Sequence, residues 1–89
     1  MPELIEKEFT QESPNWIVTV YDNEDNSYEE VIFILVFATG CDEDEAYIET
    51  WEIDHLGKSV VHQGSEEDCS RVAGLIGSIG LQTQVTQEN

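Results

Sequence analysis

The sequence predicts a single compact α+β domain in which a three-stranded sheet packs against three helices, in the order β-α-α-β-α-β. Its 89 residues are enough for one domain with one modest core. Short β-branched and aromatic runs, typical of strands, alternate with segments that begin at a capping residue and carry apolar residues at helical spacing. Residues 1–15 are polar and mixed in charge, so we expect a flexible N-terminal extension before a domain over residues 16–89.

The first strand and the first helix are indicated by strong local signals. Trp16–Tyr21 is β-branched and aromatic, which predicts a strand. After a turn, Ser27 and Glu30 have the spacing of a capping box, which predicts a helix over Tyr28–Thr39 that stops at Gly40. This helix is apolar almost all round, so we expect it to be the central buried one.

The second helix is predicted to begin at Asp42, with Glu45 at the capping-box spacing, and to end at residues 55–57. Three residues form one stripe of this helix, namely Ala46, Thr50 and Ile53. A short strand over Ser59–Gln63 follows.

Ser65 is the predicted cap of the third helix, which we expect to end at Gly80 before a last strand over Leu81–Val85. The helix has a core-facing stripe at the three-and-four spacing, formed by Cys69, Val72, Ala73, Ile76 and Ile79.

The net charge excludes several classes of partner. Twenty Asp and Glu against three basic residues give a formal charge of −17. Nucleic acids and anionic membrane surfaces both attract Lys and Arg, so we expect neither as a partner. An acidic chain instead favours cationic partners, basic patches on other proteins, or metal ions. The longest apolar run has eight residues, whereas a membrane-spanning helix needs about 20.

The first residues lack the basic start and apolar stretch of a secretory signal, and two cysteines, Cys41 and Cys69, make no disulfide framework. We therefore expect a cytoplasmic protein whose two thiols behave as small buried hydrophobes.

No catalytic or metal-binding pattern stands out in the sequence. His55 and His62 do not have a metal-ligand spacing, and neither cysteine has a nearby basic residue to lower its thiol pKa. The acidic turn after Tyr21 fails as an EF-hand loop, because Ser27 and Phe33 stand where glycine and the bidentate Glu belong. We expect no enzyme, no cofactor and no metal; a looser cation site in the turn stays open.

The same turn has a second possible use. Asp22, Asn23 and Asn26 offer acceptors that could hold an ammonium group. Beside them, the starts of the first helix and the face of the second could form an apolar cleft, lined by Tyr28, Val31, Thr50 and Ile53. A polar anchor at the mouth of an apolar pocket suits a ligand with one charged end and one apolar side chain. The alternative is a solvated capping turn over an ordinary core.

Three motifs carry a family resemblance. The chain has V-Y-D-N-E-D-N-S-Y-E-E-V at 20–31, D-E-D-E-A at 42–46 and I-D-H-L-G-K at 53–58. Their order and spacing resemble the ClpS adaptor family and the related domain of eukaryotic N-recognin ubiquitin ligases. The resemblance covers about 70 of the 89 residues, from Trp16 to Val85.

The resemblance implies an adaptor that binds substrate proteins by a bulky apolar N-terminal residue, an N-degron, and delivers them to the N-terminal domain of an AAA+ Clp unfoldase. Family positions that hold the α-ammonium correspond here to Asp22, Asn23, Glu24, Asn26 and Asp54. Those of the apolar pocket correspond to Tyr28, Val31, Thr50, Ile53 and Leu81. Weaker candidates for contact with the unfoldase are Glu66, Glu67 and Arg71.

This chain departs from the family pattern at three ammonium-binding positions. The family's Asn-Asp pair is inverted at Asp22 and Asn23, and Asp54 replaces its His. His55 lies one position after the family's His. One residue rotates a side chain about a helix by about 100°, so His55 does not replace that His. Asp54 is a chemically sensible substitute, because an ionised carboxylate only accepts hydrogen bonds and an ammonium only donates them.

Two alternatives stay open at this stage. The chain could be a ClpS-fold interaction module that has lost N-degron recognition, or an acidic mimic that binds a basic partner. Under each reading we expect a monomer.

Overall fold

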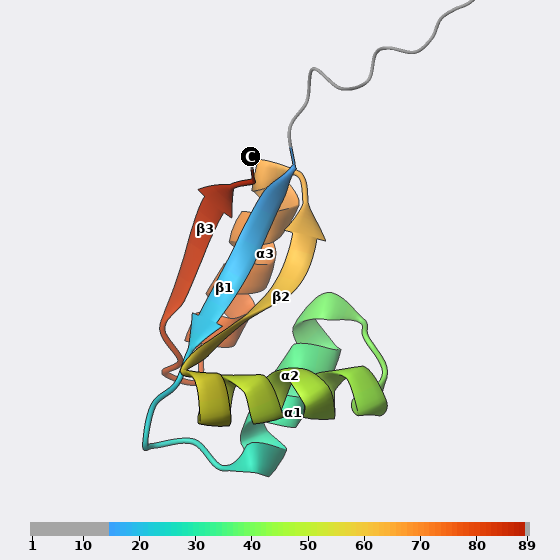
Figure 1. Ribbon diagram of the computed structural model, residues 1–89. Coiled ribbons are helices and arrows are strands. Elements are labelled where there is room, and N and C mark those ends of the chain that lie inside the picture. Colours follow the sequence, from blue (N-terminus) through green and yellow to red (C-terminus); the bar gives the residue numbers. More distant parts are fainter. Residues whose placement is uncertain (1–14, 89) are drawn as a thin grey trace, which may run out of the picture.

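A three-stranded antiparallel sheet in the order β2-β1-β3 forms the frame of the fold (Figure 1). The computed structural model describes residues 15–88, so the predicted extension over residues 1–15 lies almost wholly outside them and stays a prediction. The central strand β1 (Trp16–Tyr21) pairs on one side with β2 (Lys58–Gly64) and on the other with β3 (Thr83–Gln87). β1 therefore has a partner along both edges.

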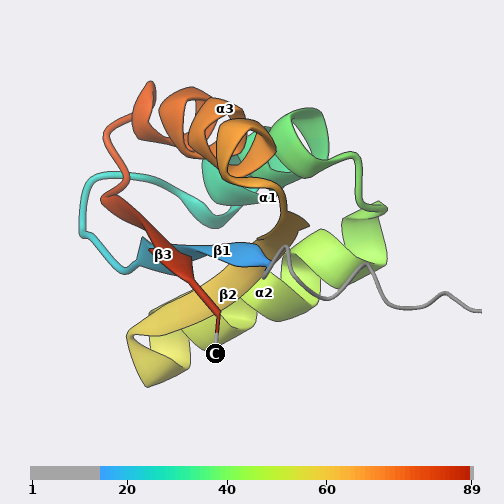
Figure 2. The same cartoon turned by 90° about the horizontal axis from the view of Figure 1, so that it is seen from above.

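The helices are α1 (Tyr28–Thr39), α2 (Glu43–Leu56) and α3 (Glu66–Gly77). α1 and α3 lie together on one side of the sheet, and α2 lies against α1 and along the edge strand β2 (Figure 2). The predicted α+β fold and its β-α-α-β-α-β order are thus confirmed. Where these elements meet, the largest fully buried side chains are Leu35, Ile76, Val18, Val20, Val72 and Cys69.

Side-chain caps explain why the helices begin where the sequence predicts. Ser27 accepts a hydrogen bond from the Glu30 N–H, and the Glu30 carboxylate accepts one from the Ser27 N–H, so the capping box is complete. The Asp42 carboxylate accepts from the Glu45 N–H at 2.8 Å. Ser65 caps α3 in the same way. Each cap satisfies backbone donors that have no partner within the helix.

The prediction that α1 is the central buried helix is wrong for one of its faces. Phe33 is 67% exposed and Phe37 is 62% exposed, and their rings stack with centroids 6.2 Å apart. α2 and α3 contact α1, and one face of α1 remains in solvent. The face that does pack inside consists of Val31, Ile34, Leu35 and Ala38.

The predicted ends of the last two elements are also wrong by two or three residues. α3 ends at Gly77, not at Gly80, because the next N–H groups bond three residues back in a tight turn that closes at Gly80 (φ 96°). β3 begins at Thr83, the first residue that pairs with Val20 of β1. Leu81 lies before the strand and is buried. β2 extends one residue further at each end than predicted.

The buried face of α2 contains one carboxylate without a hydrogen-bond partner. Glu49 is 8% exposed, and nothing in residues 15–88 hydrogen-bonds its Oε1. Burial, followed by the charges of Glu45 and Glu52, raises the pKa of Glu49 to about 7 from 4.5. The folded protein therefore binds the proton more tightly than the unfolded chain between these pKa values, and stability falls as pH rises through that window.

We predict that Glu49→Gln stabilises the fold above pH 7. The gain should be at most about 3 kcal/mol, since each pKa unit is worth about 1.4 kcal/mol, and should vanish below about pH 4.5. Urea denaturation above pH 7 and below about pH 4.5 measures this gain in the free energy of unfolding. Glu43→Gln, an exposed change on the same helix, is the control. An equal gain at both pH values would contradict the ionised buried carboxylate.

Candidate functional site

A small pocket lies at the end of the sheet where β1 leads into α1. Its volume is about 50 Å³. Nine of the ten residues predicted to bind a substrate N-terminus line it: Asp22, Asn23, Asn26, Tyr28, Val31, Thr50, Ile53, Asp54 and Leu81. The tenth, Glu24, is exposed and is not part of the lining. Four separate segments of the chain contribute, which is why the pocket exists only in the folded domain.

Two carboxylates are the charged groups of this pocket. Asp22 directly follows β1, and its N–H donates to the Gly57 carbonyl at 3.0 Å, which holds the turn against the end of α2. Asp54 lies in the last turn of α2 and accepts a hydrogen bond from the Tyr28 hydroxyl at 3.2 Å. The Asp22 side chain is exposed to solvent. An acceptor-only group is therefore left for a donor from a ligand.

The two asparagines of the turn also make hydrogen bonds that join it to a distant loop. The Asn23 amide donates to Asn26 Oδ1 at 2.8 Å and, more weakly, to the Gly80 carbonyl at 3.4 Å. The Asn26 amide donates to the Ile79 carbonyl at 3.0 Å. These bonds join the turn to the loop that precedes Leu81. The asparagines thus hold the pocket together, and the carboxylates are its available acceptors.

The rest of the pocket is mostly apolar, and Tyr28 is part of its lining. Val31, Ile53 and Leu81 are buried, and the Thr50 hydroxyl is satisfied by the Ala46 carbonyl at 2.7 Å. Burial, and then the hydrogen bond to Asp54, raise the pKa of the Tyr28 hydroxyl above 10. Tyr28 therefore remains a neutral donor to Asp54 at physiological pH.

His55 is not part of the pocket lining, although its Nδ1 lies 3.6 Å from Asp54 Oδ2. Its ring stacks on Trp51 with centroids 4.3 Å apart, and its Nδ1 lies 3.0 Å from the Trp51 carbonyl oxygen. That His55 does not replace the family's His stays a prediction. Burial raises the thiol pKa of both Cys41 and Cys69, which disfavours the reactive thiolate. Among residues 15–88, no helix has the length and apolarity to cross a bilayer.

The three weaker candidates for partner contact lie at the other end of the domain. Glu66 and Glu67 start α3, next to the end of β2, whereas the pocket follows the end of β1 (Figure 1). Arg71 pairs with Asp68 at 2.9 Å, and Asp68 also bonds His62 at 2.6 Å. The His62 hydrogen bond, then that of Arg71, lower the pKa of Asp68. Arg71 is thus fixed by a neighbour on its own helix.

The fold and the pocket define a small α+β binding domain with acidic groups beside an apolar wall. The family model described as "ATP-dependent Clp protease adaptor protein ClpS" matches residues 11–84. The chain belongs to this ClpS family, as its motifs suggested; the family's described role is that of a protease adaptor.

Two known proteins show where the likeness holds. The structure of Agrobacterium tumefaciens ClpS2 bound to L-phenylalaninamide matches with a TM-score of 0.79 at 16% identity, covering 85% of this chain and 99% of that chain. This match confirms the fold. The E3 ubiquitin-protein ligase ubr-1 of Caenorhabditis elegans is 34% identical over 74 residues. The match takes in 80% of this chain but only 4% of the ligase, so the likeness is to one small part of that protein.

We predict that Asn26→Ala loosens the pocket and destabilises the domain by about 0.5–1.5 kcal/mol, because it removes part-buried hydrogen bonds to Asn23 and the Ile79 carbonyl. Urea denaturation gives the stability, and amide exchange at residues 79–81 reports the local effect. Asp25→Ala, an exposed change in the same turn, is the control. Equal stability of the two variants would show that the ties to the Ile79 loop are unimportant.

Proposed function

We propose that this domain binds the N-terminal residue of substrate proteins and passes them to an ATP-dependent Clp unfoldase. The observation that carries the proposal is the pairing of Asp22 and Asp54 with a buried apolar wall. A protein N-terminus presents an α-ammonium with three donors directly beside a side chain. Two carboxylates that only accept hydrogen bonds suit the ammonium, and the apolar wall suits a bulky apolar side chain.

The ligand of the structural neighbour has the same chemistry. ClpS2 is bound to L-phenylalaninamide, which carries a free α-amine and an aromatic side chain. Its carboxamide corresponds to the position where a peptide would continue. The family description and the N-recognin relative also favour an N-degron-binding adaptor.

Binding of a bulky residue requires Tyr28 to move. A pocket of about 50 Å³ is small for an aromatic or large aliphatic side chain. Tyr28 lines the pocket and hydrogen-bonds Asp54. An incoming ammonium would replace this hydroxyl as the donor to Asp54, so ligand binding and opening are coupled.

The closed pocket also favours a second candidate function. If Tyr28 never leaves Asp54, the chain is an interaction module of the same fold that does not read N-termini. Peptide binding distinguishes the two, because only the first function needs a free α-amine. An acidic mimic of charge −17 would instead bind basic proteins in a salt-dependent way.

We predict that peptides beginning with Phe, Leu or Trp bind and that acetylation of their N-terminus abolishes binding. Asp54→Asn should weaken binding by about tenfold or more, since a hydrogen bond to a charged group contributes at least that factor. Fluorescence anisotropy with labelled peptides measures both effects, with Arg- and Gly-initiated peptides for comparison.

Two variants complete this experiment. Asp25→Asn removes an equal charge from the same turn outside the pocket and should change little. Tyr28→Ala removes the ring from the pocket lining. No binding by either the native domain or Tyr28→Ala would reject N-degron recognition, whereas binding by Tyr28→Ala alone would identify a pocket that Tyr28 keeps shut.

Delivery requires a second contact that leaves the pocket free. Glu66, Glu67 and Arg71 lie at the opposite end of the domain, so a substrate and an unfoldase could be held together. We assign the contact to this end of α3, with the domain acting as a monomer in the cytoplasm. Both described cysteines are free thiols, which supports a reducing compartment.

We predict that Glu67→Lys weakens binding to the N-terminal domain of a Clp unfoldase by about fivefold, the upper effect of one exposed charge pair. Binding of N-degron peptides should stay unchanged. Surface plasmon resonance measures the first and anisotropy the second. Glu43→Lys on α2 is the control; equal effects of the two variants would mean that net charge alone drives the association.

A further inference from the structure

We propose that a second site, between α2, β2 and the turn after α1, binds the charged end of a lysine or arginine side chain presented by a partner protein. The site is a cavity of about 410 Å³. Its charged and thiol groups are Glu45, Glu49, Cys41 and His62, and Val60 and Val61 form an apolar side. It shares no lining residue with the N-degron pocket.

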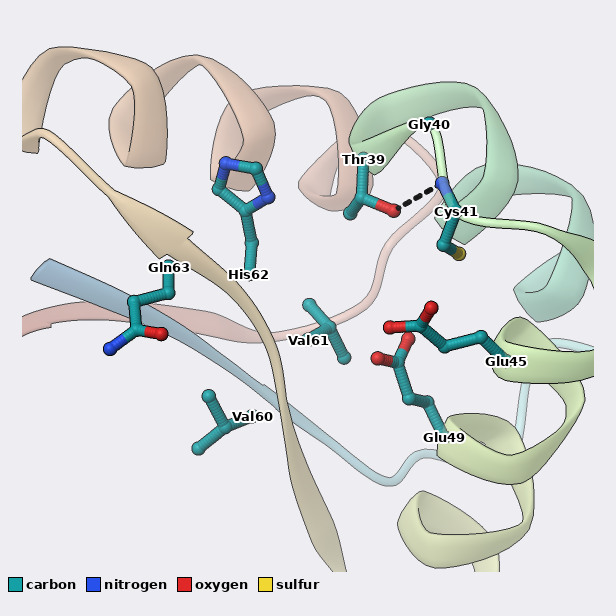
Figure 3. A pocket seen from close by; sticks show the side chains of 9 residues that line it. All are labelled: Thr39, Gly40, Cys41, Glu45, Glu49, Val60, Val61, His62 and Gln63. Carbon is teal, nitrogen blue, oxygen red and sulfur yellow. Dashed lines mark hydrogen bonds between the residues drawn. The ribbon is translucent and has the colours of Figure 1, made fainter.

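The unpartnered carboxylate of Glu49 is the main reason for this assignment. Glu49 is 8% exposed, and its Oε1 is buried without a hydrogen-bond partner in residues 15–88. Figure 3 shows the Glu45 and Glu49 carboxylates projecting from α2 toward β2, into the space below Cys41. Buried polar groups in folded proteins nearly always have a hydrogen-bond partner. The unpartnered Oε1 of Glu49 therefore indicates a partner that comes from another molecule.

The neighbouring polar groups are already engaged elsewhere. His62 bonds Asp68 at 2.6 Å, so the nearest histidine is not a partner of Glu49. The Thr39 hydroxyl donates to the Leu35 carbonyl at 2.8 Å and accepts from the Cys41 N–H. Glu45 and Glu52 add negative charge, which raises the pKa of Glu49 after the effect of burial. A cation bound beside Glu49 would supply the missing partner and offset the repulsion from Glu45 and Glu52.

The side chains around this site favour an organic cation over a metal ion. Within residues 15–88 no group of three or more His, Cys, Asp and Glu side chains is placed to hold a metal. An ammonium or guanidinium needs fewer ligands, because it donates hydrogen bonds of its own. Val60, half exposed beside the buried Val61, offers an apolar surface to the aliphatic stem of such a side chain.

The test is an NMR titration with amino acids capped at both ends. Nα-acetyl-lysine N-methylamide and its arginine analogue retain the side-chain cation but lack the α-ammonium, so the result does not depend on N-degron binding. We expect amide shifts centred on Cys41, Glu49 and Val61, with none from the capped glutamine analogue. The Glu49 carboxyl carbon should titrate at a lower pH in the presence of the lysine probe.

Glu49→Gln should weaken binding of the lysine probe by about tenfold or more, and it keeps the shape of the side chain. Glu43→Gln removes the same charge from an exposed position on α2 and should leave binding intact. Equal binding by Glu49→Gln and the native domain, or no shifts at these residues, would overturn the site. A free diamine that binds more tightly than the lysine probe would overturn the assignment to a protein side chain.

Discussion

The binding pocket depends on two side-chain amides that join parts of the chain far apart in sequence. Asn26 holds the Ile79 carbonyl at 3.0 Å, and Asn23 holds Asn26 at 2.8 Å. Because of these bonds, the loop after α3 stays against the turn after β1, and Leu81 is buried at the pocket. Backbone carbonyls are strong acceptors whatever the residue. The bond from Asn26 to the Ile79 carbonyl therefore holds the loop in place without requiring particular side chains in it.

Element boundaries set by neighbouring residues were predicted well, and boundaries set by contacts between distant parts of the chain were not. Ser27 and Asp42 lie within three residues of the N–H groups that they cap, so the starts of α1 and α2 are legible in the sequence. The start of β3 instead depends on the pairing of Thr83 with Val20 of β1, which is a tertiary contact. The exposure of Phe33 is tertiary too, because an apolar pattern does not say which faces neighbouring helices will cover.

The composition of the pocket was predictable, and its hydrogen bonds were not. Motif spacing and the family resemblance identified nine lining residues, since these positions follow from the order of the elements. The bond of Asn26 to a carbonyl 53 residues away left no signal in the sequence. Neither did the Tyr28–Asp54 bond, nor the burial of Glu49, which is one of 20 acidic residues and has no distinctive local pattern.

The acidic charge of this chain is thus put to two different uses on two faces of α2. Asp54 remains accessible at the end of the helix, where an ammonium can reach it and displace a hydroxyl donor. Glu49 is buried in the middle of the helix, where its ionised form lowers stability and an apolar residue would pack without that penalty. In the proposal for the second site, a partner cation would compensate for this buried carboxylate on binding. Under the two proposals, the surface of the domain would offer separate sites to two kinds of positive charge, a free α-amine at the pocket with Asp54 and a basic side chain at the pocket with Glu49.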